Sequence, residues 1–282
     1  MKSLIKALIV KPKVKKVNLK PHVKTFNLKT KVKIIIAFCA ITSANAFALG
    51  GTIGTSFYSN FKNKITGENS SLNVVFGGLN HQQGEFNLGL SVSASKNLSD
   101  QYGNYDLGNL SFSASHSINI QDELSFSSTY SSVLGTSEHA RKNQNLLGTL
   151  GHSLGLPLSL GEKTSLSFSL SNRFNLFKYE TDIFGNSNIL HQHTLGMSLG
   201  HQLSSWLSAG ISASATKSFT HNNVATDSYF ISASLSAQWK KLNIGLGYEK
   251  FDQFLDPSGR NSNISLFDLD ASMFNLSLST SF

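Results

Sequence analysis

The feature that most constrains this chain is an alternation with period two, in which an apolar residue is followed by serine, glycine or asparagine. The alternation begins near Leu49 and continues to the C-terminus, and Leu166–Ser171 and Ile231–Ser236 are clear examples of it. Successive side chains of a strand point to opposite faces, so the pattern predicts strands with one apolar and one small polar face. Pro157 and Pro257 lie at segment edges or in loops, where a sheet tolerates proline. The sequence therefore predicts an all-β protein.

The alternating segments number twelve, and an even number is what a single-chain bacterial barrel demands. Their lengths cluster around the ~9–11 residues that a tilted membrane strand requires. They lie near residues 49–61, 71–79, 86–96, 108–118, 123–134, 145–156, 164–177, 191–203, 206–217, 228–239, 241–250 and 270–282.

The connections between these segments alternate in length. Short turns such as 82–84 and 121–122 are predicted after the even-numbered segments, and longer polar loops, such as the one between residues 217 and 228, after the odd-numbered ones. A membrane barrel with short periplasmic turns and longer outer loops shows this alternation, whereas a soluble sandwich has no reason to follow it.

The chemistry of the two faces also favours a membrane barrel. Serine, glycine, asparagine and threonine are too small and too polar to build a hydrophobic interior. An inverted arrangement resolves this, with leucine, phenylalanine and alanine facing lipid and the small residues lining a lumen. Closure removes the unpaired strand edges that hydrocarbon would not tolerate. We therefore predict a single closed antiparallel transmembrane β-barrel over residues 47–282.

The last segment carries a more specific signal, because its apolar face ends in a C-terminal aromatic residue. The outward set consists of Phe274, Leu276, Leu278 and Phe282. This segment resembles the closing strand of bacterial outer-membrane β-barrel proteins of the porin-like class. The resemblance implies an outer-membrane location, with the segment acting as a sorting signal for the barrel assembly machinery. It also implies that lipopolysaccharide and other outer-membrane lipids surround the protein.

Residues 1–46 are predicted to be a signal peptide with a long lysine-rich n-region. An apolar run over residues 34–41 is far shorter than the ~20 residues of a spanning helix. Ala44 and Ala46 fit the small-x-small cleavage rule, which places the cut before Phe47. The single cysteine, Cys39, lies in this leader, so the mature chain would contain no disulfide.

The basic charge of the whole chain belongs to the leader. It holds eleven of the 24 basic residues and none of the 16 acidic ones, which leaves 13 − 16 = −3 for the rest. This balance gives no support for nucleic-acid binding.

Two motifs suggest chemistry, but neither predicts a catalytic or metal site. Residues 151–155 and 196–200 match the G-x-S-x-G pattern of serine hydrolases, yet no helical pattern follows them, and they are interpreted as a repeated strand with serine facing the lumen. His191 and His193 share one face but lack a third metal ligand. His152 is predicted to face lipid, and a β-bulge or a position near the periplasmic interface would relieve its cost. No cofactor is predicted.

Arg173 and Glu249 are the candidate charges of a lumen constriction. Arg173 lies well inside a segment and shares parity with serines, so it is predicted to point into the lumen. It either biases conduction toward anions or has a structural role, as an internal ion pair, for which Glu249 is the candidate partner, or as the anchor of a loop. Five lysines near the outer strand ends form either a solvated rim or contacts to lipopolysaccharide phosphates. They are Lys62, Lys96, Lys178, Lys217 and Lys250.

The predicted function is a porin-like passive channel for small solutes, with no enzymatic activity. A lumen lined by serine and glycine favours an open bore, because such residues cannot fill it. The alternatives are a structural or adhesive barrel with a plugged lumen, an outer-membrane lipid hydrolase, and a serine-rich β-solenoid. The sequence leaves the oligomeric state open.

Overall fold

The computed structural model describes residues 49–60, 71–98, 105–121, 124–254 and 272–282. The predicted signal peptide, with its cleavage site at Ala44 and Ala46, lies outside the described residues, as does Lys62. No helix in these ranges is long and apolar enough to cross a membrane.

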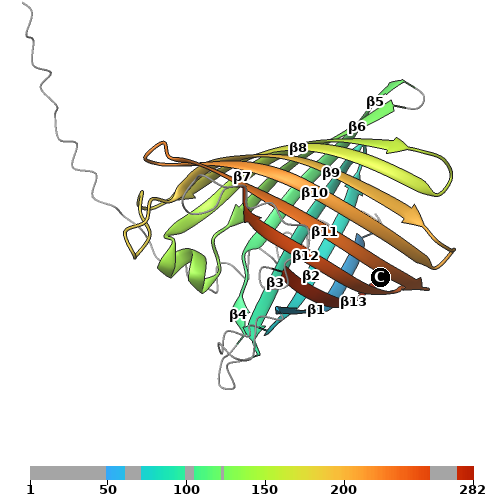
Figure 1. Cartoon of the computed structure of the whole chain (residues 1–282), viewed down its shortest axis with the longest axis horizontal. Coiled ribbons are helices and arrows are strands. Elements are labelled where there is room, and N and C mark those ends of the chain that lie inside the picture. Colours follow the sequence, from blue (N-terminus) through green and yellow to red (C-terminus); the bar gives the residue numbers. More distant parts are fainter. Residues whose placement is uncertain (1–48, 61–70, 99–104, 122–123, 255–271) are drawn as a thin grey trace, which may run out of the picture. The chain divides into compact units, whose positions relative to one another are not determined.

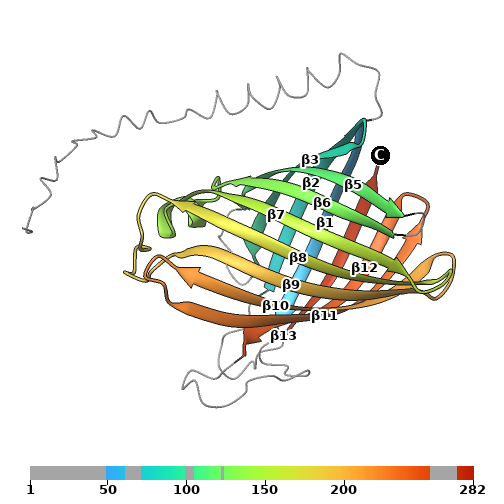
Figure 2. The same ribbon diagram turned by 90° about the horizontal axis from the view of Figure 1, so that it is seen from above.

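The described residues form one closed antiparallel sheet of twelve long strands, which runs around the barrel in Figures 1 and 2. Each long strand pairs with its neighbours in the chain, and β1 pairs with both β2 and β13, which closes the ring. The two-residue β4 pairs with β3 beyond the end of β5 and adds no thirteenth wall strand. The predicted fold class is therefore confirmed. The elements are β1 (Leu49–Asn60), β2 (Ser71–Gln83), β3 (Phe86–Asn97), β4 (Asp106–Leu107), β5 (Leu110–Gln121), β6 (Leu124–Leu134), the π-helical turn η1 (His139–Asn143), β7 (Leu146–Ser159), β8 (Thr164–Phe177), β9 (Ile189–Gln202), β10 (Leu207–Thr220), β11 (Ala225–Trp239), β12 (Leu242–Gln253) and β13 (Ser272–Ser281).

Most of the large apolar side chains of these strands face outward. Among the described residues only Ala140 and Tyr229 are buried apolar side chains, whereas large ones such as Leu195 and Ile211 are 62% and 58% exposed. A water-soluble sheet would hide these side chains in a core. The barrel instead presents them to the hydrocarbon of a membrane.

Two tryptophans mark one rim of this apolar band. Trp206 and Trp239 are 58% and 72% exposed, and both lie beside short turns at the same end of the barrel. The ammonium of Lys240 lies 5.8 Å from the Trp239 ring centroid. Aromatic rings with a cation above them are typical of the membrane–water interface. We take this end, which also holds the C-terminus, as periplasmic, and refer to the opposite end as the outer end.

The predicted alternation of short turns and long loops fails at one outer connection. Between β10 and β11 only residues 221–224 lie outside the strands, where a longer loop was predicted. Asn223 adopts a left-handed conformation with φ of 60°, and the Thr220 N–H donates to the Val224 carbonyl at 3.0 Å. Asparagine tolerates this conformation, so a tight hairpin forms and the polar residues beside it continue the strands.

Candidate functional site: the lumen

The lumen wall consists largely of small hydroxyl-bearing side chains that bond to one another across strands. The hydroxyls of Ser167 and Ser198 lie 2.7 Å apart, and Ser212 and Ser232 show the same distance. These bonds satisfy polar groups on the wall without filling the space in front of it.

Glycines on the wall lie opposite serines. Gly155 pairs with Ser127, and Gly245 pairs with Ser277. A Cβ added at either glycine would lie 2.5 Å from the hydroxyl oxygen of its serine partner, because the serine side chain occupies the space above the glycine. This packing explains the repeated G-x-S-x-G pattern as a wall motif. Neither serine of the two motifs bonds to a histidine among the described residues, and the interpretation as a strand repeat is confirmed.

A cavity of about 680 Å³ occupies the outer half of the lumen. It gathers side chains from strands far around the ring, including Ser93 on β3, Ser111 on β5 and Arg173 on β8. Only the concave inner face of a closed sheet can bring these strands to one space, so the serine face is the lumen face. Five amide side chains line this cavity: Asn109, Gln144, Asn175, Asn188 and Gln192.

Arg173 is exposed to this cavity and makes no hydrogen bond or ion pair with another described residue. The predicted ion pair with Glu249 is wrong. Glu249 instead accepts a hydrogen bond of 2.7 Å from the Asn275 amide on the neighbouring strand. Three strands separate β8 from β12 around the ring, so the two charges lie on different parts of the wall. Arg173 is four residues from Phe177, the outer end of β8, and Glu249 is four residues from Gln253, the outer end of β12.

Two outer loops, residues 135–145 and 178–188, contribute to this cavity and are bonded to each other. The Asn188 amide donates to the Gln144 carbonyl at 3.3 Å, and the Ile183 N–H donates to the Asn143 carbonyl at 3.1 Å. These contacts hold polar side chains of both loops at the outer mouth.

Asp182 also borders the outer cavity, but its charge is satisfied within its own loop. The side-chain amide of Asn186 donates to its carboxylate at 3.0 Å, and the Phe184 N–H donates at 2.8 Å. The first of these bonds is the main cause that lowers the pKa of Asp182 below its usual value. Asp182 therefore stays ionised and keeps a negative charge at the outer border of the cavity, whereas Arg173 is a cation on the wall that forms no ion pair with a described residue.

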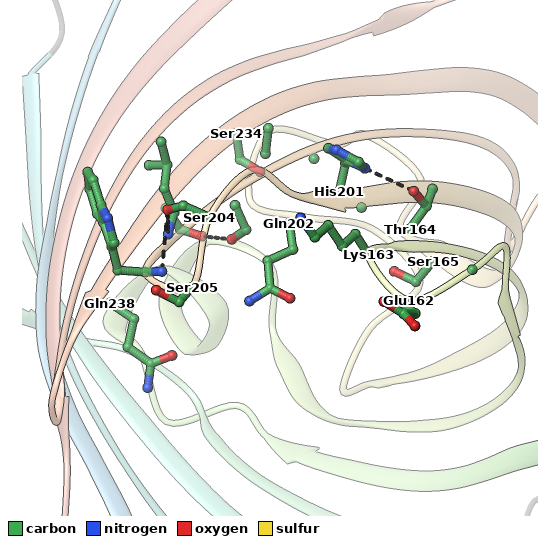
Figure 3. Close-up of a pocket in the computed structure, with 18 of the residues that line it drawn as sticks. Glu162, Lys163, Thr164, Ser165, His201, Gln202, Ser204, Ser205, Ser234 and Gln238 are labelled. Carbon is green, nitrogen blue, oxygen red and sulfur yellow. Dashed lines mark hydrogen bonds between the residues drawn. The ribbon is translucent and has the colours of Figure 1, made fainter.

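A second cavity, of about 550 Å³, lies at the periplasmic end of the lumen (Figure 3). The turns 160–163 and 203–206 border it with Glu162, Lys163 and Ser204, and Ser234 and Gln238 line it from β11. Both ends of the lumen are thus polar.

One stripe of the lumen wall was missed by the sequence analysis. On β2 the lumen face carries Leu72, Val74 and Phe76, and the Phe76 ring covers the space above Gly54. The alternation is ambiguous in this segment because both of its faces contain apolar residues, so only the register decides which of them point inward.

A serine–histidine pair on the outward face was also missed, because its members lie on different strands. The Ser128 hydroxyl and His152 Nε2 are 3.1 Å apart, and the His152 ring stacks on Tyr130 at 4.7 Å. His152 points outward as predicted, but it lies in mid-strand and the bulge of β7 falls between Leu146 and Gly148. Its polar partners, rather than a bulge at His152 or a periplasmic depth, relieve its cost.

This pair lacks the surroundings of a catalytic site. The Ser128 side chain is buried, and among the described residues no acceptor bonds to the second ring nitrogen of His152. The amide oxygen of Asn172, directly opposite His152, is bonded to His193 at 2.6 Å. A nucleophile, a base and an orienting third group are therefore not aligned here.

The outer lysines do not form one exposed rim. Lys96, Lys178 and Lys217 are near the outer strand ends, whereas Lys250 is only 1% exposed. The ammonium of Lys250 lies 5.9 Å from the Tyr229 ring centroid, so its chain packs along the wall and the predicted rim contact is wrong for this residue.

The remaining candidates are placed as follows. Phe274, Leu276 and Leu278 lie on the outward face of β13, and Phe282 exchanges two backbone hydrogen bonds of 3.0 Å with Gly51. His191 and His193 are packed with Phe219, and within the described ranges no group of three metal-ligating side chains occurs.

Comparisons with known proteins support the class that this fold defines. No family model matches the chain, and no curated protein matches it either. Among solved structures, an outer-membrane channel from Pseudomonas putida F1 is 11% identical, covers 84% of this chain and 96% of its own, and has a TM-score of 0.56. The NanC porin is 8% identical with coverages of 83% and 99% and a TM-score of 0.54. The KdgM porin, solved with disordered oligogalacturonate, is 10% identical with coverages of 82% and 99% and a TM-score of 0.51.

These likenesses show the fold. The chain is a twelve-stranded β-barrel of the bacterial outer-membrane type, and the structures that it resembles are channels and porins. Membrane lipid and lipopolysaccharide are the surroundings of such a barrel.

Proposed function

We propose that the protein is a passive channel of the porin type, which conducts small hydrophilic solutes and favours anions. The observation that carries the proposal is an Arg173 that forms no ion pair with a described residue, on a lumen wall of small hydroxyls and amides. Serine and glycine side chains leave the bore open, and a fixed cation in a narrow, low-dielectric passage raises the local anion concentration.

The polar groups of the outer cavity suggest the chemistry of a permeant solute. An amide side chain offers a donor and an acceptor side by side, and five of them converge with Arg173 on this cavity, four of which use part of this capacity in bonds within the wall and loops. Such a wall suits solutes that combine hydroxyl groups with a negative charge. Oligogalacturonate, present with the KdgM porin, is a solute of this kind, which supports the proposal without assigning that substrate here.

Conductance in a planar bilayer tests the proposal, and substitutions of the two lumen charges should shift the ion selectivity in opposite directions. Wild-type protein should form ion-conducting pores, and Arg173→Ser should move the reversal potential in a salt gradient toward cation preference. Glu249→Gln should move it the other way. Lys178→Gln, which removes a cation just beyond the end of β8, is the matched control and should change it little. Absence of conductance in the wild type would reject the channel and favour the structural barrel with a plugged lumen.

We infer further that the protein is not an enzyme. The one described serine–histidine pair on the outward face, Ser128–His152, is the feature that a lipid hydrolase would use, but its hydroxyl is buried. A fluorophosphonate probe should leave Ser128 unlabelled in folded protein. Labelling that Ser128→Ala abolishes would revive the hydrolase alternative.

We also propose that the chain is exported with residues 1–46 as a cleaved signal and that the barrel assembly machinery inserts it. The Ala44-x-Ala46 pattern and the aromatic C-terminus support this pathway. N-terminal sequencing of outer-membrane material should begin at Phe47, and a retained Met1 would contradict the cleavage.

A further inference from the structure

All six histidines of the described strands lie on the outward face of the barrel. They share their faces with leucines and phenylalanines, and none points into the lumen. A polar side chain that faces hydrocarbon is costly, so such positions call for a partner or a function. They are His81, His116, His152, His191, His193 and His201.

The outer half of this face carries a row of directly paired polar residues on six consecutive strands. The row climbs from mid-strand on β7 to the outer end at β11, because neighbours in the hydrogen-bonding direction of a tilted sheet lie at different depths. Its members are Tyr130, His152, Asn172, His193, Lys217 and Asp227.

The deep part of this row is satisfied from within the protein. His152 has Ser128 at 3.1 Å and the Tyr130 ring at 4.7 Å. Asn172 and His193 are bonded to each other at 2.6 Å. No lipid group is needed to explain His152 and Asn172.

The shallow part of the row differs, because it carries an exposed lysine ammonium. Lys217 is 53% exposed, and its ammonium lies 3.9 Å from Asp227, which is equally exposed. The exposed His193 and the half-buried His191 lie on the adjacent strand. The Phe219 ring stacks on His191 at 4.6 Å and lies 6.0 Å from the Lys217 ammonium, which holds the three nitrogen-bearing groups together.

The depth of this cluster matches the headgroups of the outer leaflet. Lys217 is three residues from Thr220 at the outer end of β10, and His193 is four residues from Ile189 at the outer end of β9. Fourteen-residue strands at a tilt of about 40° rise roughly 35 Å, whereas the apolar band of such barrels is only about 25 Å tall. Because Trp206 and Trp239 place the periplasmic boundary at the periplasmic ends of β10 and β11, the excess of roughly 10 Å falls at the outer end, where it brings the last three or four residues of these strands to or above the lipid–water boundary.

We propose that His191, His193, Lys217 and Phe219 form an external site for a phosphate group of lipopolysaccharide. The Lys217 ammonium and a ring N–H of His191 donate to phosphate oxygens, and the Phe219 ring lies against the adjoining apolar part of the lipid. The Nδ1–H of His193 donates to Asn172, so His193 adds a donor when its Nε2 also carries a proton. Asp227 keeps the Lys217 chain raised over β10 and β11 in the absence of the lipid. Lipopolysaccharide is the expected ligand because it is the phosphorylated lipid of the outer leaflet, and its phosphates lie at the depth of this cluster.

Lipid titrations of folded, detergent-solubilised full barrel test the site by native mass spectrometry. Bisphosphorylated lipid A should bind the wild type at least about tenfold more tightly than lipid A without phosphates. The double variant Lys217→Gln/His193→Gln should lose at least about fivefold in affinity for the bisphosphorylated form. Lys163→Gln, which removes a cation at the periplasmic end, is the matched control and should bind as the wild type does.

Three outcomes would overturn the proposal. Equal affinity in the double variant and the wild type would place lipid A elsewhere on the barrel. Equally tight binding of phosphatidylglycerol would show a site for lipid phosphate in general. A wild-type oligomer that the double variant dissociates without any lipid effect would identify the surface as a contact between copies of this chain. Conductance depends on none of these residues, so the channel proposal stands or falls independently.

Discussion

At the scale of the residue, the wall is organised by pairs that meet across strands. Glycine opposite serine allows close packing on the lumen face, and hydrogen-bonded polar pairs make outward polar residues tolerable. Each of these arrangements depends on one partner being small or bonded, so single substitutions test them directly.

Gly54 and Gly77 on the first hairpin provide a matched pair of glycines. A Cβ at Gly54 would lie 2.5 Å from the Phe76 ring and 2.6 Å from the Leu278 carbonyl, whereas one at Gly77 would meet nothing closer than 3.9 Å. Gly54→Ala should lower the free energy of unfolding by about 1–3 kcal/mol, because backbone cannot yield to the methyl group. Gly77→Ala should stay within about 0.5 kcal/mol of the wild type. Urea unfolding in lipid vesicles measures both, and equal effects would contradict the packing argument.

Ser128 and His152 form a second testable pair. Ser128→Ala leaves the imidazole nitrogen without its partner on the membrane face and should cost about 1–2 kcal/mol of unfolding free energy. His152→Leu in the same background should recover most of this loss, because an apolar side chain suits lipid. A double-mutant cycle on vesicle-folded protein measures the coupling, and additive effects would mean that the bond contributes nothing.

At the scale of the element, the strands are uniform while the connections differ. The tight β10–β11 hairpin and the bonded pair of outer loops are set by local turn chemistry and by contacts between loops. The loop 178–188 is held partly by Asp182, which gathers the N–H groups of Phe184 and Asn186.

The order of this loop should depend on pH. The pKa of Asp182 is lowered in the folded protein, chiefly by the bond from the Asn186 side chain. The stabilisation is therefore present above the ordinary aspartate pKa and is lost as pH falls through the lower folded value. Hydrogen exchange of residues 183–186, corrected for intrinsic rates, should be slow near neutrality and faster in acid. Asp182→Asn should abolish this difference, and a wild-type loop equally protected at both extremes would contradict the assignment.

At the scale of the whole molecule, closure is the decisive event. β13 joins β1 along nine directly paired residues, and the backbone bonds between Phe282 and Gly51 extend this seam to the last residue. A methyl group at Gly51 would overlap the Phe282 ring, so the C-terminal aromatic residue is packed against the strand that it closes on.

Deleting Phe282 should strongly reduce the amount of heat-modifiable barrel in the outer membrane. The deletion removes two seam bonds and the terminal aromatic side chain together. Phe282→Ala keeps the backbone bonds, and Phe282→Tyr keeps the ring. If the ring is the sorting signal, the alanine variant should fail in cells but still fold into vesicles in vitro. Normal outer-membrane levels of the alanine variant would show that the ring is not the sorting signal, and the effect of the deletion would then come from the two lost backbone bonds.

Much of this architecture could be predicted from the sequence because its causes are local. Period two, small polar residues on one face and an aromatic end are properties of single segments, and they determine strand number, face orientation and membrane class. The features that the sequence did not predict depend on which strands are neighbours and in which register they pair. Ser128 lies within hydrogen-bond distance of His152, and Glu249 bonds to Asn275 rather than to Arg173. Lys250 is buried beside Tyr229. Each of these contacts joins residues that are distant in the chain. Ring closure sets every register at once, because a shift at any one strand must be absorbed around the whole barrel, and only the tertiary structure contains that constraint.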